Sequence, residues 1–446
     1  MTPDRPVAII GAGAAGLMAA IHAARAGGPV VLLEGTPDGG RKILISGGGR
    51  CNILPSTLDP ARFVSAAPPH LVRRLLAAWP LAEQRTFFER DLGLALKLEP
   101  ESGKLFPASN RAREVRDRLV EAARAAGAEC RFGWPVARAV PTPDGWRLEG
   151  ASGGHLVARA LVIATGGLSV PATGSDGFGF RLAREVGHTL EPTYPALTPL
   201  VAHPAVHAAL AGLSLEVTIE ARAGDLVARA RGGFLFTHRG YSGPAVLDIS
   251  HLPARFREGP GRARVTVQWS DRDAGAWETV LAARSAQTVL RQLHDAIPAR
   301  LAERLLEECG IPSATQLAQL RREDRRALVE RLVRYPLPWT GDEGYKKAEV
   351  TGGGVALGEV EPATLLSRRV ARLHLAGEVL DAFGPIGGYN FAWAWATGRA
   401  AGLGAARTCR GAGPAARPSS ACTVPVTGCR TGCRLSAARS WSSCPR

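Results

Sequence analysis

Three glycines near the amino terminus have the spacing needed to hold a phosphate group. Gly11, Gly13 and Gly16 form the pattern Gly-x-Gly-x-x-Gly between a short apolar segment, residues 6–10, and a run of small residues at 14–26. The first glycine permits a tight turn, and the second lets the backbone approach a pyrophosphate. The following helix would present amide donors and its positive dipole end to the anion. The residues predicted at this phosphate-binding turn are Gly11, Gly13, Ala14, Ala15 and Gly16.

A carboxylate follows at the position where a nucleotide-binding unit needs one. The apolar segment 29–33 predicts a second strand, and Glu34 ends it. A carboxylate at this point accepts hydrogen bonds from the hydroxyls of an adenosine ribose, and its charge disfavours a 2′-phosphate. The glycine pattern alone is also compatible with an ordinary structural turn. The combination of a strand, the glycine turn, a helix, a second strand and the acidic residue favours a dinucleotide ligand over a structural turn.

Two more glycine-rich regions predict a ligand longer than the first turn can cover. The segments 39–42 and 46–52 follow Glu34 closely, and the segments 377–378 and 387–390 follow an apolar strand at 373–376. Glycines beside Arg and Asn suit close backbone approach to a ligand, and Glu378 could bond a ribityl hydroxyl. A helix beginning at Gly387 would direct its dipole at the pyrimidine edge of a flavin. We therefore predict FAD as the cofactor. The remaining predicted cofactor-binding residues are Gly40, Arg41, Lys42, Ser46, Gly47, Gly48, Arg50, Cys51, Asn52, Val136, Thr165, Gly166, Gly167, Gly377, Glu378, Gly387, Gly388, Tyr389 and Asn390.

The sequence evidence for residues that transfer protons is weaker than the evidence for the cofactor-binding residues. His238 lies on a glycine-rich turn and could orient a substrate or donate a proton, because imidazole titrates near neutrality; a turn histidine bonded to backbone is an equal interpretation. Tyr241 is the second candidate. Cys51 has no Cys-x-x-Cys partner, so we interpret it as a packed residue rather than a nucleophile or half of a redox dithiol.

These motifs require an α/β fold to position them. The opening strand–helix–strand rhythm predicts a Rossmann-type FAD-binding domain made of residues 1–192 and 341–407. Alternating strands separated by glycine-rich turns predict an inserted antiparallel β domain at 193–272, and the pattern at 273–340 predicts a helical subdomain. Within that subdomain, Ser313 to Gln316 read as a capping box that starts a helix.

Residues 408–446 are predicted to be a disordered tail, because the segment has no acidic residue and no apolar periodicity. Its Cys429 and Cys433 could ligate zinc, but they have no neighbouring His or second tight pair, and we predict no metal site.

Composition limits the possible partners and location. The formal charge of +15 permits nucleic-acid binding, but the basic residues are mostly Arg scattered along the chain, which favours a solvated surface. No apolar run reaches the roughly 18 residues of a membrane helix, and the amino terminus lacks the pattern of a signal peptide. We therefore expect a cytoplasmic protein with a small-molecule substrate and no membrane contact. The sequence does not indicate an oligomeric state.

Five segments resemble a known family. Gly40–Asn52, Ala164–Gly167, Phe236–Pro244, Val350–Val355 and Ala376–Asp381 are similar to motifs of the BaiN/aminoacetone oxidase (YhiN-like) family of FAD-dependent oxidoreductases, and the resemblance spans about residues 6–406. It implies a Rossmann-type FAD domain interrupted by a β domain and a helical domain. The resemblance indicates the cofactor and the fold more specifically than it indicates the reaction.

The resemblance implies two-electron hydride transfer involving a small organic substrate. No second strand–Gly-x-Gly-x-x-Gly–helix unit follows, so NAD(P)H, if it is the donor, would dock transiently. Two alternatives stay open. Ala164–Gly167 followed by Gly174–Gly179 also resembles the fumarate reductase and ketosteroid dehydrogenase flavoproteins, which act on C=C bonds. An RNA-binding flavoprotein similar to tRNA-modifying FAD proteins is the other.

Overall fold

A parallel sheet forms the centre of the FAD-binding part. The computed structural model describes residues 5–410. Its five-stranded sheet has the order β20-β10-β1-β2-β6, and every pair in it is parallel. All residues of β1 and β10 are buried, as expected for parallel strands that are covered on both faces. The strands are β1 (Val7–Ile10), β2 (Val30–Glu34), β6 (Ala128–Phe132), β10 (Ala160–Ile163) and β20 (Leu373–Leu375). The prediction of a Rossmann-type α/β fold is confirmed.

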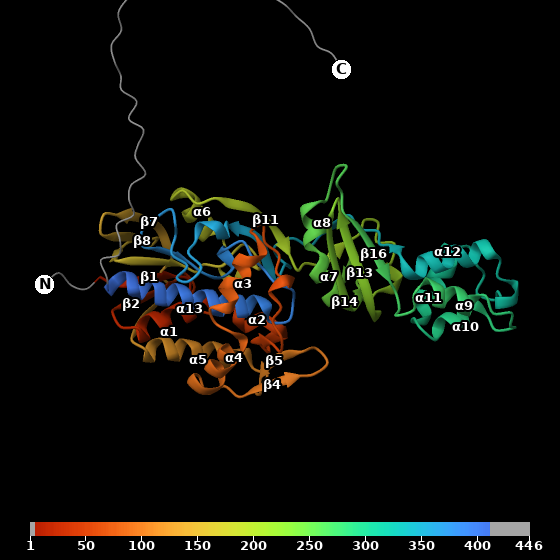
Figure 1. Ribbon diagram of the computed structural model, residues 1–446, viewed down its shortest axis with the longest axis horizontal. Helices are drawn as coiled ribbons and strands as arrows, with labels where there is room; N and C mark the ends of the chain where they lie inside the picture. Colours follow the sequence, from red (N-terminus) through yellow and green to blue (C-terminus); the bar gives the residue numbers. More distant parts are fainter. Residues whose placement is uncertain (1–4, 411–446) are drawn as a thin grey trace, which may run out of the picture. The chain divides into compact units, whose positions relative to one another are not determined.

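Two helices from opposite ends of the chain pack on each other beside this sheet. α1 (Ala14–Arg25) connects β1 to β2, and α13 (Tyr389–Arg410) lies beside it (Figure 1). The approach depends on glycines of α13, because a Cβ atom at Gly398 or Gly402 would lie 2.3 Å from the carbonyl oxygen of Ala15 or Ala19. The first strand–helix unit is therefore completed by residues almost 400 positions later.

Smaller elements surround this centre. The helices are α2 (Arg41–Gly49), α3 (Pro69–Ala77), α4 (Leu81–Thr86), α5 (Ala112–Ala125) and α6 (Phe178–Glu185). Antiparallel sheets are formed by β3 (Leu54–Pro55), β5 (Lys104–Pro107) and β4 (Leu96–Glu99), and by β7 (Val136–Thr142), β8 (Gly145–Gly150) and β9 (His155–Ala158).

A second hydrophobic core lies in the inserted region. Its seven-stranded sheet has the order β17-β16-β13-β14-β15-β12-β18 and is antiparallel throughout. The strands are β12 (Leu200–Val201), β13 (Ser214–Ala223), β14 (Leu226–Phe236), β15 (Gly240–Ser242), β16 (Arg264–Gln268), β17 (Tyr335–Pro336) and β18 (Gly341–Asp342). The helices are α7 (Pro244–Ile249), α8 (His251–Arg255), α9 (Ala274–Leu281), α10 (Val289–His294), α11 (Ala299–Glu308) and α12 (Arg322–Val333).

The strands differ from the predicted boundaries in two places. The boundary at 193 falls inside β11 (Leu190–Ala196), which pairs with β19 (Val350–Val355). β17 and β18 join the inserted sheet, although they come from residues expected in the helical subdomain and the second FAD segment. Both are two-residue strands, and their pairing depends on partners distant in sequence, which no local pattern reveals.

Two further predicted boundaries also shift, the start of one helix and the start of the tail. The capping box forms between Gln316 and Gln319, and Ser313 takes no part in it. α13 continues to Arg410, so the first residues of the predicted tail are helical. The prediction of disorder for 411–446, with Cys429 and Cys433, lies outside the described residues. Between residues 5 and 410, no helix has both the length and the apolar character needed to cross a bilayer.

Candidate active site

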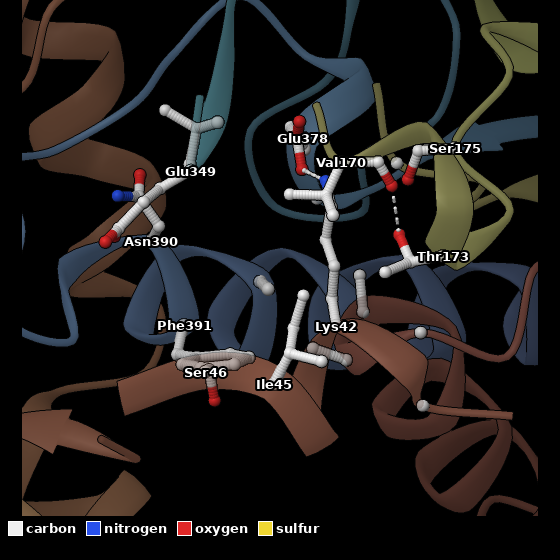
Figure 2. Close-up of a pocket in the computed structure, with 18 of the residues that line it drawn as sticks. Lys42, Ile45, Ser46, Val170, Thr173, Ser175, Glu349, Glu378, Asn390 and Phe391 are labelled. Carbon is white, nitrogen blue, oxygen red and sulfur yellow. Dashed lines mark hydrogen bonds and ion pairs between the residues drawn. The ribbon is translucent and has the colours of Figure 1, made fainter. Parts of the chain in front are cut away.

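A cavity of about 530 Å³ collects most of the predicted cofactor-binding residues. It is bordered by the amino-terminal ends of α1 and α13, by α2 and by the loop after β10 (Figure 2). The predicted residues on its wall are Gly11, Gly13, Ala14, Ala15, Glu34, Gly40, Arg41, Lys42, Ser46, Gly47, Gly48, Arg50, Asn52, Thr165, Gly166, Gly377, Glu378, Gly387, Gly388 and Asn390. Segments that are far apart in the sequence thus share one cavity.

The three glycines of the first turn have different surroundings. Gly11 has φ +99°, and a Cβ atom on it would lie 2.5 Å from the Ala164 carbonyl oxygen. A Cβ atom on Gly16 would lie 1.8 Å from the Gly11 carbonyl oxygen, whereas one on Gly13 would meet no atom within 4 Å. Gly13 also caps α1 without a side-chain hydrogen bond. The open space beside Gly13 and the amides of α1 therefore fit a pyrophosphate.

The Glu34 carboxylate is held in place by its own strand end. Its Oε1 accepts hydrogen bonds from the Thr36 amide at 2.8 Å and the Thr36 hydroxyl at 2.7 Å, and its Oε2 accepts one from the Ala12 amide at 2.8 Å. A carboxylate oxygen accepts about two hydrogen bonds, so Oε2 keeps capacity for a ribose hydroxyl. This arrangement fits the adenosine half of FAD.

A second carboxylate joins three of the predicted motifs. Glu378 Oε2 accepts a hydrogen bond from Lys42 Nζ at 2.7 Å, and its Oε1 accepts one from Ser169 Oγ at 2.7 Å. Lys42 Nζ also donates to Ser169 Oγ at 2.6 Å, and the Thr351 amide donates to Glu378 Oε1 at 3.0 Å. The Lys42 and Glu378 side chains are 25% and 18% exposed, so this network is largely shielded from water. It fixes both groups at the middle of the cavity.

Buried polar atoms on the cavity wall lack protein partners. Asn52 Oδ1 and Thr165 Oγ1 are buried and have no hydrogen-bond partner among the described residues. Buried polar atoms of this kind are uncommon, and each calls for an explanation. Both residues border the cavity, so a polar ligand there would satisfy them. Together with the open space at Gly13, they show that the residues fit FAD.

Several predicted residues lie behind the wall rather than on it. Gly16 and Gly167 act through packing, because a Cβ atom on Gly167 would lie 2.4 Å from Thr351 Oγ1. Cys51 is fully buried, and burial raises the pKa of its thiol to about 12, which agrees with a packed residue and opposes a nucleophile. Tyr389 is buried beside Phe63. Val136 lies on β7, outside the cavity lining.

The two candidates for proton transfer do not reach the cavity. His238 is exposed on the turn between β14 and β15. Tyr241 is fully buried in the core of the inserted sheet, where its hydroxyl lies 2.8 Å from His207 Nδ1, and burial raises its pKa. The glycine-rich turn around His238 shapes the inserted sheet and not the cavity.

Sequence reasoning missed other residues of the wall. Lys104, Phe106, Glu349 and Phe391 all line the cavity. Lys104 and Phe106 lie on β5, whose short apolar pattern carries no nucleotide-binding signal. Glu349 directly precedes the segment Val350–Val355, and this adjacency is the one sequence signal that could have identified it.

Comparisons with known proteins identify the family of this chain. The family model described as HI0933-like protein Rossmann domain matches residues 5–404. The chain is 36% identical to the ribosomal RNA dihydrouridine synthase of Escherichia coli, over 87% of this chain and 95% of that protein. It is 34% identical to the 3-dehydro-bile acid delta(4,6)-reductase of Clostridium scindens, over 90% of this chain and 98% of that protein.

Two solved structures match most of this chain at low sequence identity. One is the open conformation of a flavocytochrome c3 fumarate reductase, with a TM-score of 0.46 and 18% identity over 91% of this chain and 78% of that chain. The other is the 3-ketosteroid-delta4-(5alpha)-dehydrogenase of Rhodococcus jostii RHA1, with a TM-score of 0.45 and 16% identity over 90% and 96%. On the family match and the two curated relatives, the chain belongs to the HI0933-like Rossmann family and is an FAD-dependent oxidoreductase.

Proposed function

We propose that this protein uses FAD to reduce a carbon–carbon double bond conjugated with a carbonyl group, with NAD(P)H as the electron donor. When bound, FAD supplies the two electrons of such a reduction as a hydride. Two relatives support the substrate class by their names, a dihydrouridine synthase and a delta(4,6)-reductase of a 3-dehydro-bile acid. Each name describes a ring in which such a double bond becomes saturated.

The observation that carries the proposal is the amino terminus of α13 on the cavity wall. Gly387 and Gly388 have φ values of +106° and +97°, and they border the cavity immediately before this 22-residue helix. A helix amino terminus carries a partial positive charge, which would stabilise the negative charge of a reduced flavin. The amino terminus of α1, on the same cavity, would stabilise the pyrophosphate in the same way. The chain therefore supplies one helix terminus for each anionic part of FAD.

An anaerobic two-step experiment tests the proposal. The FAD-loaded protein is titrated with NADH and with NADPH, and the flavin absorbance is followed. The reduced protein is then mixed with cyclohex-2-enone or with a uridine-containing oligonucleotide, and products are analysed by mass spectrometry. We expect reoxidation of the flavin and a product that has gained two hydrogens. A flavin that stays reduced with both compounds, and is reoxidised only when air is admitted afterwards, would contradict the proposal.

A ribosomal RNA substrate is the second candidate for the same chemistry. It is favoured by the name of the Escherichia coli relative and by the formal charge of +15. Binding through phosphates weakens steeply as salt rises. Salt-dependent binding of RNA by the FAD-loaded protein would therefore favour it, and failure to bind RNA at low salt would favour a small substrate.

A further inference from the structure

Three carboxyl groups line the cavity within residues 5–410, and they are not equivalent. Glu34 and Glu378 each accept several hydrogen bonds from the protein, as described above. The Glu349 carboxyl group makes neither a hydrogen bond nor an ion pair with any described residue. We propose that Glu349 is the catalytic acid that delivers the substrate proton in the cavity. This inference rests on the proposed function and deepens it.

The backbone at Glu349 is fixed although its carboxyl group is free. Its amide donates to the Leu197 carbonyl oxygen at 3.2 Å, and its carbonyl oxygen accepts a hydrogen bond from Ser169 Oγ at 3.3 Å. Ser169 belongs to the Lys42–Glu378 network, and the next residue, Val350, begins the fully buried strand β19. A free functional group on a rigid support is the arrangement that proton transfer requires.

Glu349 also lies at the appropriate end of the cavity. Figure 2 shows it near Asn390, whereas Thr173 and Ser175 lie at the other side of the cavity. Gly174 lies near Thr36, whose amide donates a hydrogen bond to Glu34. Because we assign Glu34 to the adenosine ribose, this side of the cavity is the adenosine end. Asn390 belongs to the first turn of α13, the helix whose amino terminus we assign to the flavin. Glu349 therefore lies at the end of the cavity where the amino terminus of α13 would hold the flavin part of FAD.

The surroundings of Glu349 favour its protonated form. Burial raises the pKa of its carboxyl group, the Lys104 cation on β5 lowers it, and the Asp248 carboxylate on α7 raises it. The residue is exposed, and it borders the cavity, so a cofactor and substrate bound there would cover part of its side chain. Asp248 is itself close to Arg62, at 3.8 Å, which limits its effect. A carboxyl group whose pKa is raised above its usual range is better suited to donate a proton as a general acid.

The proposed step balances in atoms and charge. The substrate double bond receives a hydride at one carbon, and the O–H bond of Glu349 breaks as its proton joins the neighbouring carbon. Glu349 is left as a carboxylate, which water reprotonates through the cavity. The substrate is reduced by two electrons, which bound FAD would supply as the hydride and NAD(P)H would replace.

The test compares Glu349→Gln with a matched control. Glutamine keeps the size and polarity of glutamate but has no acidic proton. Glu303→Gln on α11 is the control, because Glu303 is exposed and makes neither a hydrogen bond nor an ion pair with any described residue. We expect both variants to retain FAD and the wild-type Tm. Reoxidation of the reduced flavin by cyclohex-2-enone should slow by about 10²–10⁴-fold in Glu349→Gln only, since this is the usual contribution of a general acid. Glu349→Asp should recover part of the rate.

A second readout does not depend on turnover. Infrared spectra are recorded at about pH 6, where ordinary carboxyl groups are ionised and Asp248, whose pKa is raised to about 6, gives a partial signal that is common to all variants. We expect a carboxylic-acid C=O band in the FAD-loaded wild type that Glu349→Gln lacks and Glu303→Gln keeps. The absence of this band, or equal reoxidation rates in wild type and Glu349→Gln, would overturn the role of Glu349. If the enone does not reoxidise the wild type while the band is present, the proposed substrate class fails and the protonated Glu349 stands.

Discussion

Gly13→Val should separate cofactor binding from folding. A Cβ atom at Gly13 meets no protein atom within 4 Å, and Gly13 has φ −77° and ψ −170°, a conformation that valine adopts easily. Loss of backbone freedom in the unfolded chain contributes about 0.4–1 kcal/mol of stability, and a poorer helix cap offsets a similar amount. We therefore expect the stability of the apo-protein to change by less than about 1 kcal/mol.

The same substitution should strongly weaken FAD binding. The added methyl groups enter the space where the amides of α1 face the cavity. If two charge-assisted hydrogen bonds to the pyrophosphate are lost, at about 1.5–3 kcal/mol each, the cost is about 3–6 kcal/mol. Each 1.4 kcal/mol is a factor of ten in Kd, so the Kd should rise by about 10²–10⁴-fold.

The assay is fluorescence titration of apo-protein with FAD, alongside thermal unfolding of the apo-protein. Gly16→Ala is the informative contrast, because its Cβ atom would lie 1.8 Å from the Gly11 carbonyl oxygen and should destabilise the fold itself. A Gly13→Val protein that binds FAD with the wild-type Kd would refute the assignment of the pyrophosphate to this turn.

Three further results are expected. Burial raises the pKa of Asp248 to about 6, although the Ile386 amide and Arg62 both lower it. The contribution of Asp248 to the free energy of unfolding is therefore fully present at low pH and is lost as pH rises through about 6. About two pKa units correspond to about 3 kcal/mol, so Asp248→Asn should gain up to that amount on wild type between about pH 4 and 7 in urea unfolding; a constant difference would contradict this. Lys42→Met leaves the partly buried Glu378 without its cation and should cost about 1–3 kcal/mol in the same assay, and an unchanged unfolding midpoint would argue against the network. Truncation after Arg410 should preserve FAD content, because every cavity-lining residue lies between Gly11 and Ala394, and a colourless truncated protein would show that the site is incomplete without 411–446.

The lining of the candidate cavity was largely predictable because the signals of its residues are local. The spacing of Gly11, Gly13 and Gly16 is dictated by a single turn, and Glu34 ends the next strand, so short sequence windows contain the required information. Gly377 and Glu378 followed the same logic at the end of β20. Gly11, Gly13, Glu34, Gly377 and Glu378 each need only their own strand and turn to reach the cavity, and Gly16 packs directly behind it.

The remaining features depend on long-range packing. Glu349 reaches the cavity because β19 pairs with β11 some 160 residues earlier, and no pattern around Glu349 encodes that pairing. His238 and Tyr241 looked suitable by residue type, yet the pairing of β14 with β15 commits them to the inserted sheet. The short strands β17 and β18 were missed for the same reason.

The most direct test of the account is the identity and amount of flavin that the protein holds. The purified protein is saturated with a mixture of FAD and FMN, freed of unbound ligand and denatured, and the released flavin is identified by mass spectrometry. A cavity that continues from Asn390 to Glu34 predicts one FAD per chain and exclusion of FMN, which lacks the adenosine half. Release of FMN in preference to FAD, or of no flavin, would contradict it.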